Sequence, residues 1–227
     1  MSLQEIDNSL ITTINFDGPA AYDLFWWMYT DKWTWIPLAL VVVWYLLRQS
    51  RDAKAALLVV AAFGLLFALS DQIPTSLIKP LACRLRPSHN PDILGLLSYV
   101  NDYHGGLYGF PSNHASNGFA AATFLTLLFR RRITSAVAFL WACGSCYSRM
   151  YLGVHYVSDI LCGALLGVAL AFAVFALYRH ACLRLLKPDT WETFAARYRA
   201  HEPLGIAGIF AVTIVVLAFL SFYNSIP

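Results

Sequence analysis

The sequence has little charge. Asp, Glu, Lys and Arg together make up only 13% of the 227 residues, whereas a soluble globular domain usually carries about 25%. Hydrophobic residues supply 59% of the chain, and the mean hydropathy is +0.58. This composition excludes an ordinary soluble domain and indicates an integral membrane protein. The formal net charge of +3 is too small to suggest a nucleic-acid partner.

The cysteines do not form the pattern of a disulfide framework. Their number, five, is odd, and Cys143, Cys146 and Cys162 fall in apolar segments. The stretch Cys-Gly-Ser-Cys at 143–146 has the spacing of a redox or metal-binding pair, but no second cysteine pair or histidine cluster completes such a site. We therefore interpret these cysteines as small apolar side chains inside the fold. The sequence predicts no metal site and no other cofactor.

The N-terminal segment lacks the features of a cleavable signal peptide, because the first 20 residues contain three carboxylates and no basic region. Apolar residues instead recur at roughly helical spacing within segment 1–23: Leu3, Ile6, Leu10, Ile11 and Ile14. This pattern predicts an amphipathic helix lying at a membrane interface. Segment 186–203 mixes charge with Trp191 and Phe194 and is predicted to be a second interfacial piece.

Six apolar segments are candidates for crossing a membrane, which takes about 20 residues. They lie near 33–48, 55–79, 111–129, 133–151, 155–178 and 204–223. The predicted fold is therefore all-α: one polytopic membrane helical bundle over 1–227, with a core at 24–178, the two interfacial segments and an extra C-terminal span. Gly205 and Gly208 leave open whether the last segment crosses fully.

The basic residues predict the orientation of this bundle. Most of them fall between spans one and two, three and four, or five and six: Arg48, Arg51, Lys54, Arg130, Arg131, Arg132, Arg179, Arg184, Lys187, Arg197 and Arg199. We assign that side to the cytoplasm, so both termini face outward. The outer side keeps only Lys32, Lys79, Arg84, Arg86 and Arg149. Four of these five cluster in two short segments, which calls for a reason other than topology.

Three polar stretches meet the same outer surface. "KPLACRLRP" at 79–87 ends the second span, "PSNH" at 111–114 opens the third, and "SRMYLGVHYVSD" at 148–159 joins the fourth to the fifth. The four-residue spacing of His155 and Asp159 places both on one helix face, close enough to pair. Cations, two histidines, an aspartate and serines are thus expected at one leaflet.

This set of residue types suits phosphoryl transfer through a phosphohistidine. Arg and Lys side chains match the oxygens of a phosphate and stabilise the charge that spreads over a transferring phosphoryl group. A histidine nucleophile needs a carboxylate on its far nitrogen, and Asp159 can supply it to His155. His114 can protonate the leaving oxygen. The helix N-terminus behind Ser112 adds an anion site.

The order and spacing of these motifs resemble the type-2 phosphatidic acid phosphatase superfamily, also called lipid phosphate phosphatases. The resemblance runs from Lys79 to Asp159 and implies a five-helix core, with no metal requirement. It implies His155 as nucleophile, Asp159 as the residue that orients it, and His114 as general acid. The phosphate would be bound by Lys79, Arg86, Arg149, Ser112 and the backbone at Asn113. The family usually has Gly at the position of Asn113; because Asn tolerates unusual backbone angles, we expect the turn to be preserved.

Three residues near these motifs keep open roles. Arg84 is either a lipid-headgroup anchor or part of the site. Asp71 lies inside the second span, where a carboxylate usually faces a cavity or a partner, and we hypothesise that it pairs with a phosphate-site cation. Ser148 is a possible contact to the headgroup or to other site residues.

The predicted function is hydrolysis of a lipid phosphate or diphosphate at the outer face of a bacterial inner membrane. Among candidate substrates the sequence analysis favours undecaprenyl diphosphate over the 1-phosphate of lipid A, phosphatidylglycerol phosphate and phosphatidic acid. A lipid phosphotransferase is the alternative class, since the same intermediate can pass its phosphoryl group to an acceptor other than water. Vanadate-dependent halide oxidation and a non-catalytic lipid transporter are the remaining alternatives.

Overall fold

The computed structural model of the chain describes residues 2–188 and 191–225, and its regular structure is helical. The α-helices are α1 (Leu3–Ile14), α2 (Ala20–Thr30), α3 (Ile36–Gln49), α4 (Ala53–Gln72), α5 (Lys79–Ala82), α6 (Asn113–Phe129), α7 (Arg132–Tyr151), α8 (Val157–Leu185), α9 (Trp191–Arg199) and α10 (Leu204–Tyr223). The described residues contain no β-strand, only an isolated bridge between Leu85 and Tyr108. The predicted all-α fold is confirmed.

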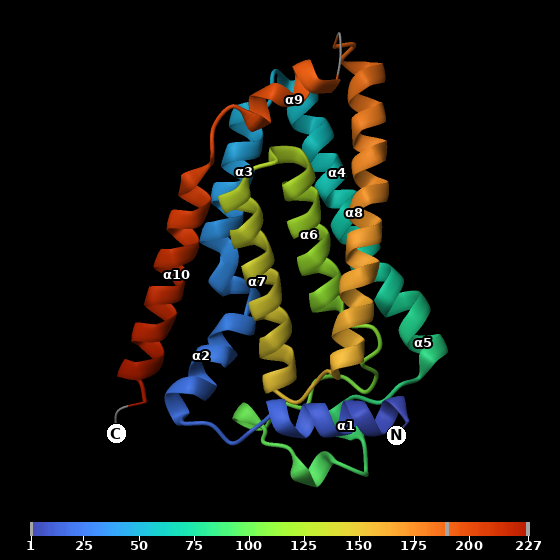
Figure 1. The fold of residues 1–227 in the computed structure, drawn as a ribbon, viewed down its shortest axis with the longest axis vertical. Coiled ribbons are helices and arrows are strands. Elements are labelled where there is room, and N and C mark those ends of the chain that lie inside the picture. The colour runs from blue at the N-terminus through green and yellow to red at the C-terminus, as the bar shows by residue number, and fades with distance from the viewer. Residues whose placement is uncertain (1, 189–190, 226–227) are drawn as a thin grey trace.

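Each of the six apolar segments contains a long helix of the bundle (Figure 1). The helical stretches 53–82, 157–185 and 204–223 are long and apolar enough to cross a membrane by length and composition. The first of them is continuous because α4 runs through a π-helical stretch at Ile73–Ile78, which contains Pro74, into α5. Proline has no N–H to donate, so it favours such a local change of helical pitch.

The helices in the two segments predicted to be interfacial are shorter than those segments. The helix expected over 1–23 ends at Ile14, and the chain then turns before α2 begins at Ala20. The break has a local cause, because Pro19 cannot donate a hydrogen bond to a continuing helix, and the Asn15 side chain bonds the backbone of other segments instead. In segment 186–203 the helix is α9; residues 189 and 190 lie outside the described residues.

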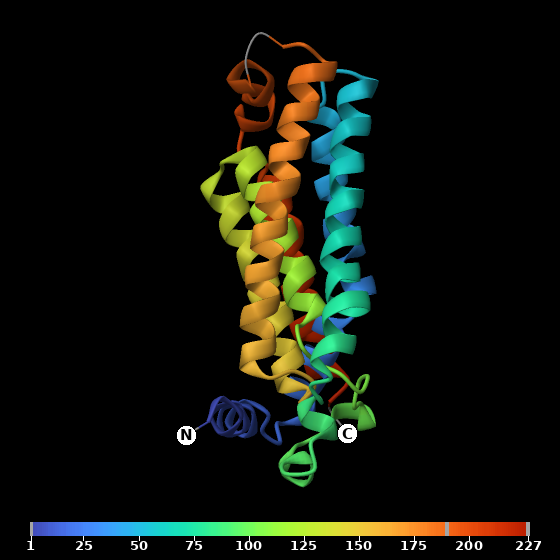
Figure 2. The same ribbon diagram turned by 90° about the vertical axis from the view of Figure 1, so that its right-hand side faces the viewer.

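The bundle has two distinct ends (Figures 1 and 2). At one end α9 lies over the turns that join α3 to α4 and α6 to α7. At the other end lie α1, the irregular segment 83–112 and both chain termini. Helix α1 is seen end-on in Figure 2, so it lies across the bundle axis, and it contacts α7 and α8. The polar motifs at 79–87, 111–114 and 148–159 all come from this second end.

Helix α6 occupies the middle of the bundle, between α4, α7 and α8 (Figure 1). Its contact with α8 is close because Gly163 and Gly167 of α8 face the α6 backbone, at the carbonyl oxygens of Ser112 and Ser116. A Cβ at either glycine would overlap those oxygens. Small residues at a four-residue spacing allow membrane helices to approach in this way. The packing fixes the start of α6 against the start of α8.

We expect Gly167→Ala to destabilise the bundle by about 1–3 kcal/mol, the usual cost of adding a buried methyl group to a filled contact. The measurement is the midpoint of thermal unfolding in detergent. Gly64→Ala is the matched control, because a Cβ at Gly64 of α4 meets nothing within 4 Å. Equal midpoints for the two variants would contradict the close α6–α8 contact.

Candidate active site

His155 and Asp159 form a buried pair where α8 begins. His155 precedes the helix and is 1% exposed, and Asp159 lies in the first turn and is fully buried. The Nδ1 atom of His155 is 3.3 Å from Oδ2 of Asp159. The backbone N–H of Tyr156 donates to the same oxygen at 3.1 Å, which holds the carboxylate in place. With Nδ1 donating to Asp159, Nε2 is the imidazole nitrogen left to face other groups.

Arg86 lies directly against that nitrogen. Its Nη1 atom is 3.2 Å from Nε2 of His155 and donates to the carbonyl oxygen of Val154 at 3.1 Å, and its Nε donates to that of Tyr108. Burial, followed by the charge of Arg149, lowers the pKa of Arg86 to about 10, so the guanidinium stays charged at neutral pH. The backbone at Gly109 closes the site, since a Cβ there would be 2.8 Å from Oδ2 of Asp159.

The nucleophile candidate is neutral. Burial, followed by the positive charges of Arg86 and Arg149, holds the pKa of His155 well below its usual value. A neutral imidazole has a free lone pair on Nε2, which is what attack on phosphorus requires. The surrounding cations that disfavour a proton on the ring are the groups that would attract a phosphate.

Arg149 is held by segments far away in the sequence. It lies in the last turn of α7 and is buried. Its two terminal nitrogens donate to the Tyr103 hydroxyl at 2.9 Å and to Oγ1 of Thr30 at 3.0 Å. The sequence analysis missed both partners. Ser148 next to it donates to the carbonyl oxygen of Ser145 in its own helix, so its hydroxyl is engaged away from the phosphate-site cations.

Lys79 is held by Asn113. The lysine Nζ donates to Oδ1 of Asn113 at 2.5 Å, and the amide nitrogen of Asn113 donates to Oδ1 of Asp71 at 2.8 Å and to Oγ1 of Thr75 at 2.6 Å. The hypothesis of a direct pair between Asp71 and a phosphate-site cation is wrong in this respect: Asn113 stands between Asp71 and Lys79. The amide can do this because it offers both a donor and an acceptor.

The start of α6 presents an anion site to the same region. Ser112 is the N-cap, and its hydroxyl oxygen accepts from the backbone N–H of Ala115 at 3.4 Å. Its own N–H donates to the carbonyl oxygen of Asp159 at 3.0 Å, which joins the two helix starts. Asn113 is the first helical residue and has no positive φ, so the unusual backbone angle considered for it is not needed. His114 follows, partly exposed, with no hydrogen bond to its ring among the described residues.

Arg84 is part of the site and not a free anchor. One terminal nitrogen donates to Oδ1 of Asp159 at 2.8 Å, and the other donates to Oδ2 of Asp7 at 2.7 Å. The sequence analysis did not find Asp7. A signal was present in the sequence, because Asp7 lies four residues before the apolar Ile11 and thus on the same helix face.

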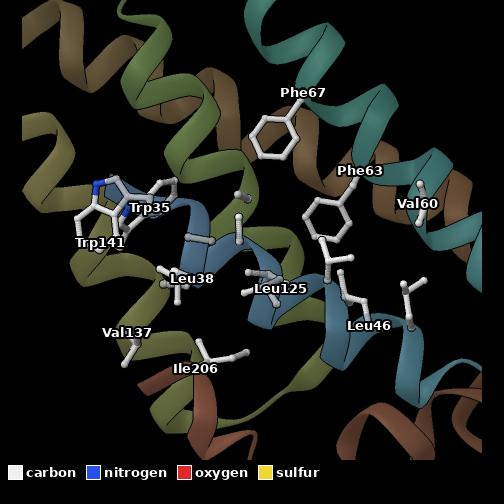
Figure 3. A pocket seen from close by; sticks show the side chains of 17 residues that line it. Trp35, Leu38, Leu46, Val60, Phe63, Phe67, Leu125, Val137, Trp141 and Ile206 are labelled. Atoms are coloured by element: carbon white, nitrogen blue, oxygen red, sulfur yellow. The ribbon is translucent and has the colours of Figure 1, made fainter. Parts of the chain in front are cut away.

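An apolar cavity of about 300 Å³ lies further along the bundle (Figure 3). Its lining comes from α3, α4, α6 and α7, with Trp35 of the 3-10 turn before α3 and Ile206 of α10. Phe63 and Phe67 of α4 point into it, opposite Leu38 and Leu46 of α3 (Figure 3). Phe67 precedes Asp71 by one helical turn, a rise of about 6 Å, so the cavity extends close to the polar end of α4.

These groups can perform phosphoryl transfer. A buried neutral imidazole is oriented by a carboxylate, faces an arginine, and shares its end of the bundle with a second arginine, a lysine and a helix N-terminus. Fixed cations of this kind stabilise the charge on a transferring phosphoryl group. Within residues 2–188 and 191–225 no three His, Cys, Asp or Glu side chains gather as metal ligands.

We expect Asn113→Ala to weaken the binding of orthovanadate, an analogue of the transferring phosphoryl group, by about tenfold, because Lys79 loses a charge-assisted hydrogen bond. Titration calorimetry of the purified protein measures this. Ser148→Ala is the matched control and should bind as the parent does, since its hydroxyl bonds within α7. Unchanged binding in Asn113→Ala would refute the role of Asn113 in holding Lys79.

Comparisons with known proteins identify the family of this chain. The family model described as the PAP2 superfamily matches residues 55–181, more than half of the chain. A lipid A 4'-phosphatase of Bacteroides thetaiotaomicron is 38% identical over 83% of this chain and 83% of the relative. A second, from Porphyromonas gingivalis, is 32% identical over 80% of this chain and 77% of the relative.

The fold is shared with a solved structure. The crystal structure of the transmembrane PAP2-type phosphatidylglycerolphosphate phosphatase from Bacillus subtilis has a TM-score of 0.57 and 20% identity, covering 77% of this chain and 85% of that one. At this identity the match shows the fold alone. Together with the family match over 55–181 and the relatives, the chain belongs to the PAP2 superfamily and is a membrane phosphatase that acts on lipid substrates.

Proposed function

We propose that this phosphatase hydrolyses a phosphate monoester of lipid A, at the 4' position. The observation that carries the proposal is the similarity to two lipid A 4'-phosphatases, at 38% and 32% identity over four fifths or more of this chain. The prediction of undecaprenyl diphosphate as the favoured substrate has no support among these relatives. Lipid A phosphatase, ranked below it in the sequence analysis, agrees better with them.

The position of the site supports a lipid substrate. The phosphate-site residues lie at one end of an apolar bundle, where a headgroup can reach them while hydrocarbon chains stay in the membrane. The apolar cavity beside Phe63 and Phe67 (Figure 3) offers room next to α4 for part of such a chain. Pockets of this kind commonly hold the apolar part of a ligand.

We propose a two-step mechanism for the roles of the site residues. Nε2 of His155 attacks phosphorus, a bond forms between nitrogen and phosphorus, and the bond from phosphorus to the lipid oxygen breaks. The bound phosphate brings negative charge to the surrounding cations, which allows His114 to be protonated, and His114 then gives its proton to that oxygen. Asp159 stabilises the positive charge that develops on the ring of His155, while Lys79, Arg86, Arg149 and the N-terminus of α6 hold the phosphoryl oxygens.

In the second step water attacks the phosphohistidine. His114, now neutral, takes a proton from the water, the bond between nitrogen and phosphorus breaks, and inorganic phosphate leaves. His155 returns to its neutral form and His114 to its protonated form. In this scheme Lys79, Arg86, Arg149 and the dipole of α6 supply positive charge to the phosphoryl oxygens, and no metal ion takes part.

The distribution of the basic residues supports an outward-facing site. The turns after α3 and α6 carry Arg51 and Arg130, and both lie at the α9 end of the bundle. The rule that basic residues stay on the cytoplasmic side then directs the opposite end, with α1 and the phosphate site, to the periplasm. We propose the bacterial inner membrane as the location, because lipid A then meets the site in the outer leaflet.

The test is phosphate release by the purified protein in detergent with EDTA present. We expect release from lipid A with loss of the 4'-phosphate, identified by mass spectrometry of the product. His155→Ala should lower turnover by at least about a thousandfold, since it removes the nucleophile. Undecaprenyl diphosphate, phosphatidylglycerol phosphate and phosphatidic acid form the comparison panel.

Each other outcome corrects a different part of the proposal. Preference for another lipid of the panel would replace lipid A as the substrate. A strict requirement for Mg²⁺ would contradict the metal-independent mechanism. Transfer of the phosphoryl group to an added lipid or sugar, with no free phosphate, would identify a phosphotransferase. Full activity of a folded His155→Ala variant would refute the phosphohistidine.

A further inference from the structure

Helix α1 contains a carboxylate that is buried although much of the helix is exposed. Asp7 is 2% exposed, whereas Leu3 is 66% exposed and Leu10 is 42% exposed. Oδ1 of Asp7 accepts from the backbone N–H of Ser158 at 3.2 Å, and Oδ2 accepts from the Ser158 hydroxyl and from Nη2 of Arg84 at 2.7 Å. A buried carboxylate destabilises the fold unless it is paired, and Ser158 and Arg84 supply the partners of Asp7.

Arg84 connects this carboxylate to the site. Its guanidinium is a planar fork, and the two terminal nitrogens face two carboxylates: Nη2 bonds Asp7, and Nη1 bonds Oδ1 of Asp159 at 2.8 Å. The fork lies over the ring of Tyr156, 4.4 Å from its centroid, and Nη2 also donates to Oε1 of Gln4 at 3.2 Å. Asp7 and Gln4, both on α1, thus fix one side of the guanidinium.

The second carboxylate oxygen of Asp159, Oδ2, lies beside the proposed nucleophile, His155. Oδ2 accepts from the backbone N–H of Tyr156 and faces Nδ1 of His155. The carboxylate therefore has Arg84 on one oxygen and His155 on the other. Because Arg84 and His155 bond the same carboxylate, the orientation of Asp159 toward the imidazole depends on Arg84. The contacts form one continuous series from Asp7 through Arg84 and Asp159 to His155.

We propose that Asp7 is a positioning residue for catalysis, which acts through Arg84 to hold Asp159, and hence His155, in the reactive orientation. The inference rests on the proposed role of His155. Without the charge of Asp7, the guanidinium keeps a single carboxylate partner, Asp159, and its second terminal nitrogen is no longer fixed by a charge. The docking of α1 is thereby part of the active site's assembly.

The alternative role of Asp7 is to attach α1 to the bundle and nothing more. Other contacts already do this. Ile11 is fully buried against Ile93, Leu97 and Tyr156. The side-chain amide of Asn15, at the end of α1, donates to the carbonyl oxygens of Tyr151 at 2.5 Å and Ser98 at 2.9 Å. Asn15 touches no part of the series from Asp7 to His155, so the two roles can be separated by mutation.

The experiment measures kcat and KM for phosphate release from lipid A in detergent micelles, per folded enzyme. Asp7→Asn keeps the shape of the side chain and removes its charge. We expect kcat to fall by about tenfold, as small misplacements of a reacting group do, with KM changed less than about twofold since the phosphate contacts remain. Asp17→Asn, an exposed carboxylate after α1, is the matched control and should behave as the parent.

Two further variants separate positioning from docking. Asn15→Ala should lower the unfolding midpoint without the fall in kcat. In an Arg84→Gln background, Asp7→Asn should cause no additional fall in kcat, because the residue through which Asp7 acts is already gone. Asp7→Asn with the parent's kcat, multiplicative losses in the double variant, or an equal loss in Asn15→Ala would each overturn the inference. If the parent itself releases no phosphate, the proposed function fails, and the inference fails with it.

Discussion

The structure depends on one constraint: a carboxylate and an imidazole are buried at the polar end of an apolar bundle. Asp159 is fully buried, and His155 is 1% exposed. Burying a charge costs several kcal/mol unless hydrogen bonds and opposite charges offset it. The partners of Asp159 come from the guanidinium of Arg84, the backbone of Tyr156 and the ring of His155. Arg84 of segment 83–110 bonds both Asp159 and Asp7 of α1. These ion pairs hold the segment and the helix at this end of the bundle.

The apolar part of the bundle supplies the rigidity that such a site needs. Gly163 and Gly167 bring α8 against α6, and the N–H of Ser112 bonds the carbonyl of Asp159. Helix α8, which carries Asp159, and helix α6, which carries His114, are thus in direct contact. Sites built on packed helices hold their geometry better than sites on loops alone. These two glycines therefore connect the geometry of the candidate active site to the packing of the helices.

The sequence predicted the features that depend on local pattern. Hydropathy gave the long helices, because a membrane span needs an uninterrupted apolar run. The four-residue spacing predicted the pairing of His155 with Asp159. Contacts between distant segments could not be predicted in this way. Asp7 lies far from Arg84 in sequence, and Asn113 meets Asp71 across two helices. Tertiary packing determines which distant residues pair. A single sequence contains no periodic pattern that indicates such pairs. The substrate proposed here, lipid A, rests on the similarity to two lipid A 4'-phosphatases and not on a local pattern in the sequence, which favoured undecaprenyl diphosphate.

The central claim is that His155 carries the phosphoryl group. Its most direct test is to trap the intermediate: lipid A labelled in its phosphate is mixed with the enzyme, the reaction is stopped within milliseconds in alkali, and the peptides are analysed by mass spectrometry. The account predicts label on the imidazole of His155, stable to base, lost in acid, and absent from His155→Ala. Turnover of labelled lipid with no label on the protein at any time, or label on another residue, would contradict it.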